Sequence, residues 1–233
     1  MDNNADSKYL KPTAIIDSDH DEIIQYAHQI SGSGKRPAEK AVSLFYAVRD
    51  DIRYDPYHPF YRPEHYRASA VLKCKKGFCV CKASLLCALG RTVGIPSRVG
   101  FADVRNHLAT RQLVELLGSN LFVYHGFVEF YLDGKWVKAT PTFNKELCSR
   151  HHVPPLDFNG RDDSVFQSFN DDKKKFMEYV RFHGTYDDIP IDTIIAAWEN
   201  TYGKDRVRDW IHAYEKLSEK DKPDFYKEDI ITD

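Results

Sequence analysis

The sequence lacks a dominant charge, a long apolar run and an apolar segment at its start. Its 233 residues carry 33 Lys and Arg against 35 Asp and Glu, and this net charge of −2 gives no global field toward nucleic acid or an anionic membrane. No stretch approaches the roughly 20 apolar residues that span a bilayer. Residues 1–6 are polar and acidic, without the apolar run of a signal peptide. We therefore expect a soluble, cytoplasmic protein with no nucleic-acid and no membrane partner.

Paired cysteine motifs are also missing. The first four of the five cysteines have the spacing C-x4-C-x-C-x5-C, without the C-x2-C pairs of structural zinc sites. An odd number of cysteines without a signal peptide indicates reduced thiols rather than a disulfide framework. We expect no metal site and no cofactor, and a thiol redox or metal-binding protein stays open as an alternative. The cysteines are Cys74, Cys79, Cys81, Cys87 and Cys148.

The composition is that of a folded chain, with 42% hydrophobic and 13% aromatic residues, enough for a sizeable core. Apolar periodicity predicts two N-terminal helices, within residues 19–30 and 37–54. Residues 1–160 are expected to form the main domain and residues 161–233 a helical extension packed on it as one compact unit. In that extension, Phe176, Tyr179 and Val180 follow helical spacing up to Gly184, and residues 191–202 and 204–217 predict two more helices.

Cys79 lies where a loop is expected to become the central helix. Gly77 allows a change of chain direction, and the Ala/Leu pattern from Lys82 to Arg91 predicts a buried helix. The free N–H groups and the positive dipole end of a helix N-terminus favour an anion. A thiol in this first turn is therefore expected to shift toward the thiolate, the nucleophilic form.

A β-hairpin follows later in the chain and carries a histidine. Val123 to Leu132 is β-rich, Asp133-Gly134 is a hairpin turn signal, and residues 135–139 form the return strand. His125 lies in the first of these strands. A histidine on a strand is more often structural, but nucleophilic thiol catalysis needs an imidazole that accepts the thiol proton and later protonates the leaving group. Cys79 and His125 are therefore the candidate pair.

Together these segments resemble the transglutaminase-like superfamily over about residues 40–145. In such families a Gly-x-Cys opens the central helix, the helix closes in Gly-Ile-Pro-Ala-Arg, and a His strand precedes a Trp strand that ends in Asp-Pro-Thr. Here the same features read Gly77-Phe78-Cys79, residues 94–98 (GIPSR), His125 and Trp136. The flanks 9–30 and 156–163 also look similar to bacterial members described as cysteine proteases. The resemblance implies an α+β, papain-like fold in which a cysteine-bearing helix packs on an antiparallel sheet.

The resemblance also implies Cys79 as nucleophile and His125 as base, but the third position departs from the pattern. Thr140 occupies the place of the family's aspartate. Its hydroxyl can hold the imidazole tautomer, although it supplies no negative charge to stabilise the imidazolium. Asn144 is the alternative orienter, since a Cys-His-Asn arrangement serves papain-like proteases. Glu129 and Asp157 would contribute only if the fold brings them to His125.

The expected function is therefore a thiol-dependent acyl-transfer enzyme that acts on a peptide or other amide through a Cys79 thioester. The acyl group would pass to water, as in a cysteine protease or amidase, or to an amine, as in a transglutaminase-like acyltransferase. A catalytically lapsed binding module is the alternative that the missing aspartate favours. The aromatic loop of residues 55–67 lines a substrate groove or pins itself to the domain body, and the sequence favours neither reading.

Overall fold

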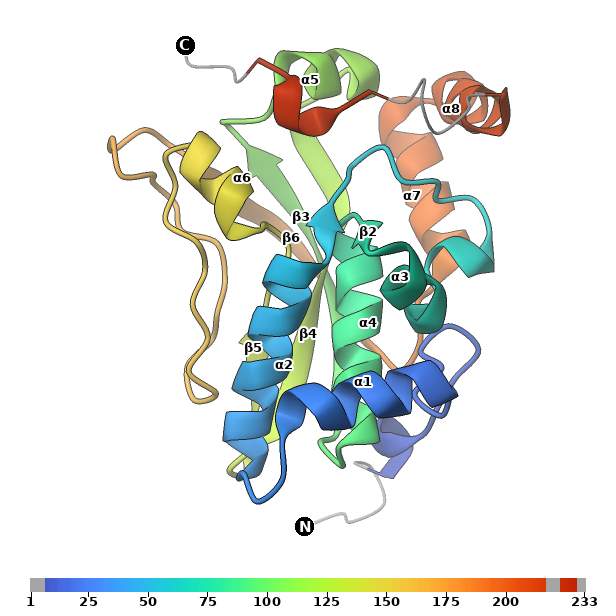
Figure 1. The fold of residues 1–233 in the computed structure, drawn as a ribbon. Coiled ribbons are helices and arrows are strands. Elements are labelled where there is room, and N and C mark those ends of the chain that lie inside the picture. Colours follow the sequence, from blue (N-terminus) through green and yellow to red (C-terminus); the bar gives the residue numbers. More distant parts are fainter. Residues whose placement is uncertain (1–6, 217–222, 230–233) are drawn as a thin grey trace.

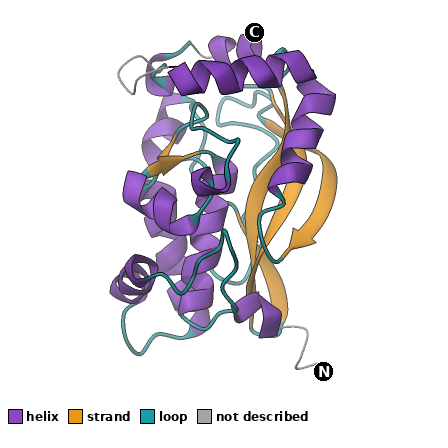
Figure 2. Ribbon diagram, turned by 90° about the vertical axis from the view of Figure 1, so that its right-hand side faces the viewer, coloured by secondary structure: helices purple, strands orange, loops and turns teal. Residues whose placement is uncertain are grey.

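A computed structural model describes residues 7–216 and 223–229 of the chain. A layer of helices lies against one four-stranded antiparallel sheet (Figures 1 and 2). This α+β arrangement, with a cysteine-bearing helix packed on an antiparallel sheet, confirms the predicted fold class. The helices in chain order are η1 (Ser7–Leu10), α1 (Asp21–Ser31), α2 (Pro37–Asp51), η2 (Pro63–His65), α3 (Ala68–Cys74), α4 (Cys79–Thr92), α5 (Arg111–Leu117), α6 (Lys145–Arg150), α7 (Ile191–Tyr202), α8 (Lys204–Lys216) and η3 (Phe225–Lys227).

The main sheet has the strand order β5-β4-β3-β6. The predicted hairpin is present, and the turn residues Asp133 and Gly134 both have positive φ angles, 48° and 87°, as a tight turn between twisted strands requires. A separate pair of two-residue strands, β1 (Arg53–Tyr54) and β2 (Lys76–Gly77), runs in parallel just before α4. The strands of the main sheet are β3 (Ser97–Asn106), β4 (Leu121–Leu132), β5 (Lys135–Ala139) and β6 (Met177–Tyr186).

Helix α4 is the centre of the fold. Every residue from Val80 to Arg91 is buried, because α4 lies against β3 and β4 on one side and against α1, α2 and α3 on the other. Gly90 permits close contact with the sheet, since an added Cβ would stand 2.5 Å from a ring carbon of Phe130. A helix enclosed in this way places its first residue in a fixed position, and that residue is Cys79.

The predicted helix at Phe176–Gly184 is wrong. Phe176 directly precedes β6, and residues 177–184 belong to β6, which pairs antiparallel with β3; Gly184 with φ 87° lies within the strand. The spacing of Phe176, Tyr179 and Val180 fits a helix face, but β6 supplies hydrogen-bond partners to the otherwise unpaired edge of β3, and this tertiary pairing overrides the local pattern. The described part of residues 161–233 thus contains a strand of the main sheet as well as helices.

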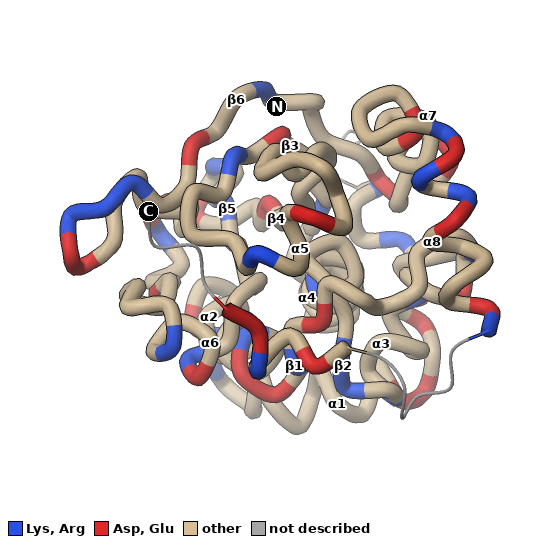
Figure 3. Tube along the Cα trace, turned by 90° about the horizontal axis from the view of Figure 1, so that it is seen from above, with Lys and Arg blue, Asp and Glu red and all other residues tan. Residues whose placement is uncertain are grey.

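The predicted helices in residues 191–217 are present as α7 and α8, and α7 lies against β4. The short segment 223–229, with η3, crosses above the start of α4 near α5 (red in Figure 1). Acidic and basic residues are interspersed along the chain (Figure 3). In the ranges described, no helix combines the length and apolar character needed to cross a membrane.

Candidate active site

Cys79 is the first residue of α4, as the sequence predicts, and it stays partly exposed while the helix behind it is buried. Gly77 allows the tight approach to this helix. A Cβ at Gly77 would stand 2.6 Å from the Cβ of Cys81, so a larger residue would displace the first turn. Cys81 points away from Cys79, and its Sγ donates to the carbonyl of His65 at 3.4 Å.

His125 lies on β4 and is 5% exposed. The next residue, Gly126, packs directly on the first turn of α4, since an added Cβ would stand 3.0 Å from Val80 Cα. The residue after the cysteine and the residue after the histidine are therefore in contact. The structure thus brings the helix start and the histidine strand together, as a thiol–imidazole site requires.

Two cavities border both candidate residues. The first, which we call the α6-side cavity, has a volume of about 50 Å³ and extends toward Phe143, Leu147, Phe176 and Phe225. The second, the α7-side cavity, has a volume of about 70 Å³ and extends toward Phe78, Tyr124, Trp198 and Tyr202. The two cavities share the lining residues Tyr54, Cys79, Leu113, Phe122 and His125.

Burial outweighs the shift toward the thiolate that the helix start predicts for Cys79. Burial raises the pKa of the Cys79 thiol to about 11, although the backbone N–H groups of Gly126, Val80 and Cys79 lower it. Burial also lowers the pKa of His125 to about 3. The helix N-terminus does favour the anion, but apolar walls remove more hydration than the N–H groups replace. Near neutral pH the resting pair is a neutral thiol and a neutral imidazole.

Nε2 of His125 is buried and has no hydrogen-bond partner among the described residues. The ring packs at 5.0 Å from the ring of Phe166. A buried nitrogen without a hydrogen-bond partner is energetically costly, so this atom is a candidate for contact with an orienting group.

Thr140 and Thr142 follow the end of β5, which pairs with β4, the strand that carries His125. Ala139 pairs with Val128, and continuing this register would set Thr140 beside Phe127 and Thr142 beside His125. Both hydroxyls are buried and unpartnered in the described structure. The Thr140 hydroxyl partly offsets the burial that raises the pKa of Tyr179 to about 12, which places these two groups near each other.

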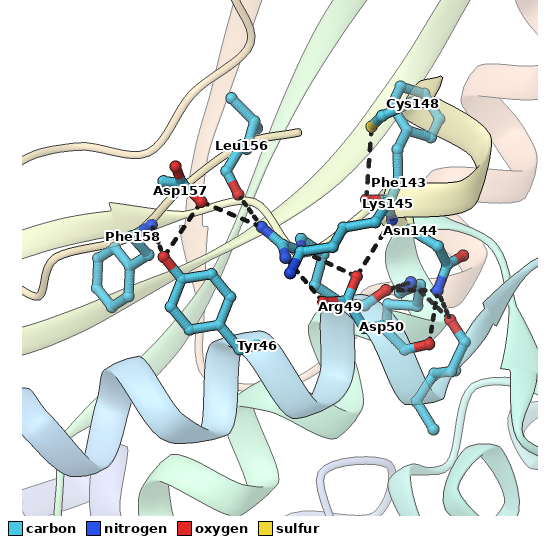
Figure 4. Close-up of polar contacts among 12 residues, drawn as sticks. Tyr46, Arg49, Asp50, Phe143, Asn144, Lys145, Cys148, Leu156, Asp157 and Phe158 are labelled. Carbon is cyan, nitrogen blue, oxygen red and sulfur yellow. Dashed lines mark hydrogen bonds and ion pairs between the residues drawn. The ribbon is translucent and has the colours of Figure 1, made fainter. Parts of the chain in front are cut away.

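Asn144 lies elsewhere and is fully engaged. Its Oδ1 accepts the backbone N–H of Tyr54 at 2.8 Å and the hydroxyl of Tyr226 at 3.0 Å. Its Nδ2 donates to the carbonyls of Arg49, Asp50 and Ile52 at the end of α2 (Figure 4). The structure gives Asn144 no bond to His125; it joins the end of α2 to β1 and to the start of α6.

The remaining carboxylates are also committed to other partners. Glu129 forms an ion pair with Arg98 at 2.6 Å. Asp157 forms one with the buried guanidinium of Arg49 at 3.4 Å, and Arg49 also donates to the Leu156 carbonyl (Figure 4). These pairs tie β4 to β3 and α2 to residues 156–157. The structure does not bring either carboxylate to His125.

A strained residue precedes the histidine, and nothing in the sequence analysis pointed to it. Tyr124 has a φ of 56°, unusual for a residue with a side chain. Asp103 holds this conformation, because its Oδ1 accepts the Tyr124 N–H at 3.0 Å and contacts His183 Nε2 at 2.7 Å. The His183 ring stacks on the Tyr124 ring at 4.1 Å. This arrangement fixes the direction in which β4 delivers His125.

Most of the loop aromatics pin the loop to the domain body. Tyr66 is fully buried, Tyr57 donates to Glu228 at 2.6 Å, and Phe60 packs on Trp198 at 4.7 Å. Of residues 55–67, only Pro56 borders one of the two cavities. Within residues 7–216 and 223–229, no three His, Cys, Asp or Glu side chains are grouped to hold a metal ion.

Comparison with known proteins gives one family match. The model of the transglutaminase-like superfamily matches residues 24–141, just over half of the chain. This range contains α4, the β4–β5 hairpin, Cys79, His125 and Thr140. No curated protein matches the chain.

Solved structures give weaker matches. One, named "Putative Cysteine Protease", is from Cytophaga hutchinsonii; it is 18% identical with a TM-score of 0.48, and the match covers 79% of this chain and 55% of that chain. Another, a "putative protease" from Parabacteroides distasonis, is 18% identical with a TM-score of 0.39, covering 55% of this chain and 26% of that chain. The chain therefore spans about half of the first protein and about a quarter of the second.

Proposed function

Because the chain belongs to the transglutaminase-like superfamily, we propose that it is a thiol-dependent acyl-transfer enzyme with Cys79 as nucleophile and His125 as base. The observation that carries this proposal is that both side chains open into the same two cavities, beside the contact between Gly126 and Val80. The substrate is a peptide or other amide. The names of the two similar structures agree with a protease reaction.

The reaction begins with a neutral pair. As an amide carbonyl enters, the thiol proton of Cys79 passes to His125 while the sulfur–carbon bond forms. The negative carbonyl oxygen then faces the N–H groups that surround the sulfur, which belong to Cys79, Val80 and Gly126. When the carbon–nitrogen bond breaks, the imidazolium gives its proton to the departing amine. A thioester remains on Cys79.

The second half of the reaction regenerates the thiol. Water, or a second amine, gives its proton to His125 and attacks the thioester carbonyl. The sulfur–carbon bond breaks, and the proton returns from the imidazolium to the sulfur. Hydrolysis and transfer to an amine thus use the same residues and differ only in the attacking group.

Thr140 is the residue we propose to orient His125 through Nε2. The assignment is supported by the burial of both atoms and by the lack of a hydrogen-bond partner for Nε2 among the described residues. Groups too far apart for a direct hydrogen bond are commonly joined by one bridging water. A thiol depends less on a third carboxylate than a serine does, because it ionises more readily.

Acyl-enzyme trapping tests the proposal. The intact protein is treated with 4-nitrophenyl acetate, and the acetylated residue is mapped by mass spectrometry. One acetyl group on Cys79, removable with hydroxylamine and absent from the Cys79→Ser and His125→Ala variants, is expected. Acetylation of the exposed Cys74 at the same rate as Cys79 would instead favour a catalytically lapsed binding module.

A further inference from the structure

We propose that the site is built for amides with an aromatic or large aliphatic side chain close to the reacting carbonyl. This inference rests on the proposed function and names the substrate class of the same site. It follows from the two cavities that meet at Cys79.

The first observation is electrostatic. None of the described residues that line either cavity is an Asp, Glu, Lys or Arg. The two histidines in the linings, His125 and His151, are neutral near pH 7, because burial lowers their pKa values to about 3 and about 4. A charged substrate side chain would lose its hydration here without gaining a partner, which is strongly unfavourable.

The second observation concerns the polar atoms of the α7-side cavity. Trp198 Nε1 donates to the Val123 carbonyl at 3.2 Å, and the Tyr202 hydroxyl donates to the Leu121 carbonyl at 2.9 Å. The backbone of β4 therefore satisfies both polar groups. The rings of Trp198 and Tyr202 therefore present carbon surface to a ligand, as aromatic residues do in other sites that bind apolar groups.

The third observation is that an aromatic side chain of this chain already packs at the α6-side cavity. Phe225 lies 5.6 Å from the Tyr54 ring and 6.4 Å from the His151 ring. Its segment is anchored by Glu228, whose carboxylate accepts the hydroxyls of Tyr57 at 2.6 Å and Thr110 at 2.7 Å. Phe225 thus adds a fixed aromatic face to the wall of the cavity beside Cys79.

The sizes agree with a side chain rather than a methyl group. The cavities measure about 50 Å³ and about 70 Å³, whereas on this measure one water molecule needs about 10–15 Å³. Each cavity has room for several water molecules. An apolar side chain that displaces them gains the free energy of burial on both surfaces.

Three chloroacetamides test the inference: 2-chloroacetamide, N-benzyl-2-chloroacetamide and N-(2-carboxyethyl)-2-chloroacetamide. Alkylation rates are measured residue by residue in the full chain, and the exposed Cys74 reports the intrinsic reactivity of each reagent. At Cys79, the alkylation rate with the benzyl reagent should exceed the rate with the carboxyethyl reagent by about 10-fold or more. This ratio is first divided by the same ratio of rates measured at Cys74. Equal normalised rates, or no labelling of Cys79 by the benzyl reagent, would overturn the inference.

Variants connect this preference to the cavity walls. A Trp198→Ala, Phe225→Ala double variant should bring the normalised benzyl-to-carboxyethyl ratio toward one. The control is Phe182→Ala, because Phe182 is 56% exposed and lines neither cavity. A ratio that the double variant leaves unchanged would contradict the assignment. The reagent 2-chloroacetamide separates the two proposals. If it alkylates Cys79 no faster than Cys74, the result counts against Cys79 as the nucleophile. The benzyl-to-carboxyethyl ratio still tests the apolar preference of the cavities in that case.

Discussion

Gly126 lies so close to Val80 that an added Cβ would stand 3.0 Å from the Val80 Cα and 3.4 Å from its nitrogen. Both neighbours are backbone atoms of the first turn of α4, so they cannot move aside as a flexible side chain would. The contact holds the strand residue after His125 against the helix residue after Cys79. Any larger residue at position 126 must push α4 away from β4.

The Gly126→Ala variant should therefore separate the thiol from the imidazole. We expect the alkylation rate of Cys79 per folded molecule to fall by about 10-fold or more, since small displacements of a reacting group are costly. The control is Ile23→Val, a core change on α1 expected to cost about 1 kcal/mol of stability. Unchanged Cys79 reactivity in Gly126→Ala would show that this contact does not set the geometry.

Replacing Thr140 by aspartate should strengthen the site. An aspartate carboxylate reaches one bond further than the threonine hydroxyl and stabilises the imidazolium form of His125. Thr140→Asp should therefore raise the pKa of His125 and move the pH profile of Cys79 alkylation to lower pH. Thr140→Asn is the matched control, because it has the same shape without the charge. Identical profiles for the two variants would exclude position 140 from contact with His125.

Replacing Asn144 should affect stability more than reactivity. Asn144→Ala removes the hydrogen bonds to Tyr54, Tyr226 and the carbonyls at the end of α2. We expect the free energy of unfolding to fall by about 1–3 kcal/mol, measured by urea denaturation. Asn159→Ala, on an exposed loop, is the control and should change little. A loss of Cys79 reactivity at unchanged stability would make Asn144 the orienter instead.

The buried histidines predict how stability depends on pH. Burial lowers the pKa of His125 from 6.5 to about 3 and that of His151 from 6.5 to about 4. Between these values the unfolded chain binds protons that the folded chain does not, so the free energy of unfolding should fall as pH decreases from 6.5 to 4. His125→Gln or His151→Gln should flatten this dependence in urea denaturation. Equal slopes in wild type and both variants would contradict the neutral, buried state of these rings.

The parts of the fold with strong local signals were predictable from the sequence. Gly77 and the Ala/Leu pattern of residues 82–91 predicted the helix that begins at Cys79, and Asp133-Gly134 predicted the hairpin. Each signal depends on neighbours a few residues away, where helix periodicity and turn chemistry act.

Other features depend on pairing between distant segments, and local patterns did not reveal them. Strand β6 forms because β3 offers it an edge. The ionisation of Cys79 depends on walls contributed by residues as distant as Phe225. Likewise, Asp103 reaches Tyr124 only after β3 and β4 have paired. The strain at Tyr124 also had no signal in the sequence, since tyrosine does not favour a positive φ.

The most direct test of the account is the iodoacetamide alkylation rate of Cys79 as a function of pH, with the labelled residue mapped by mass spectrometry. We predict that Cys79 reacts faster than the exposed Cys74 near neutral pH, because His125 accepts the thiol proton as the bond between the sulfur and the reagent forms. We also predict that His125→Ala removes this advantage while leaving Cys74 unchanged. Equal rates for Cys79 in wild type and His125→Ala at every pH would contradict the thiol–imidazole pair.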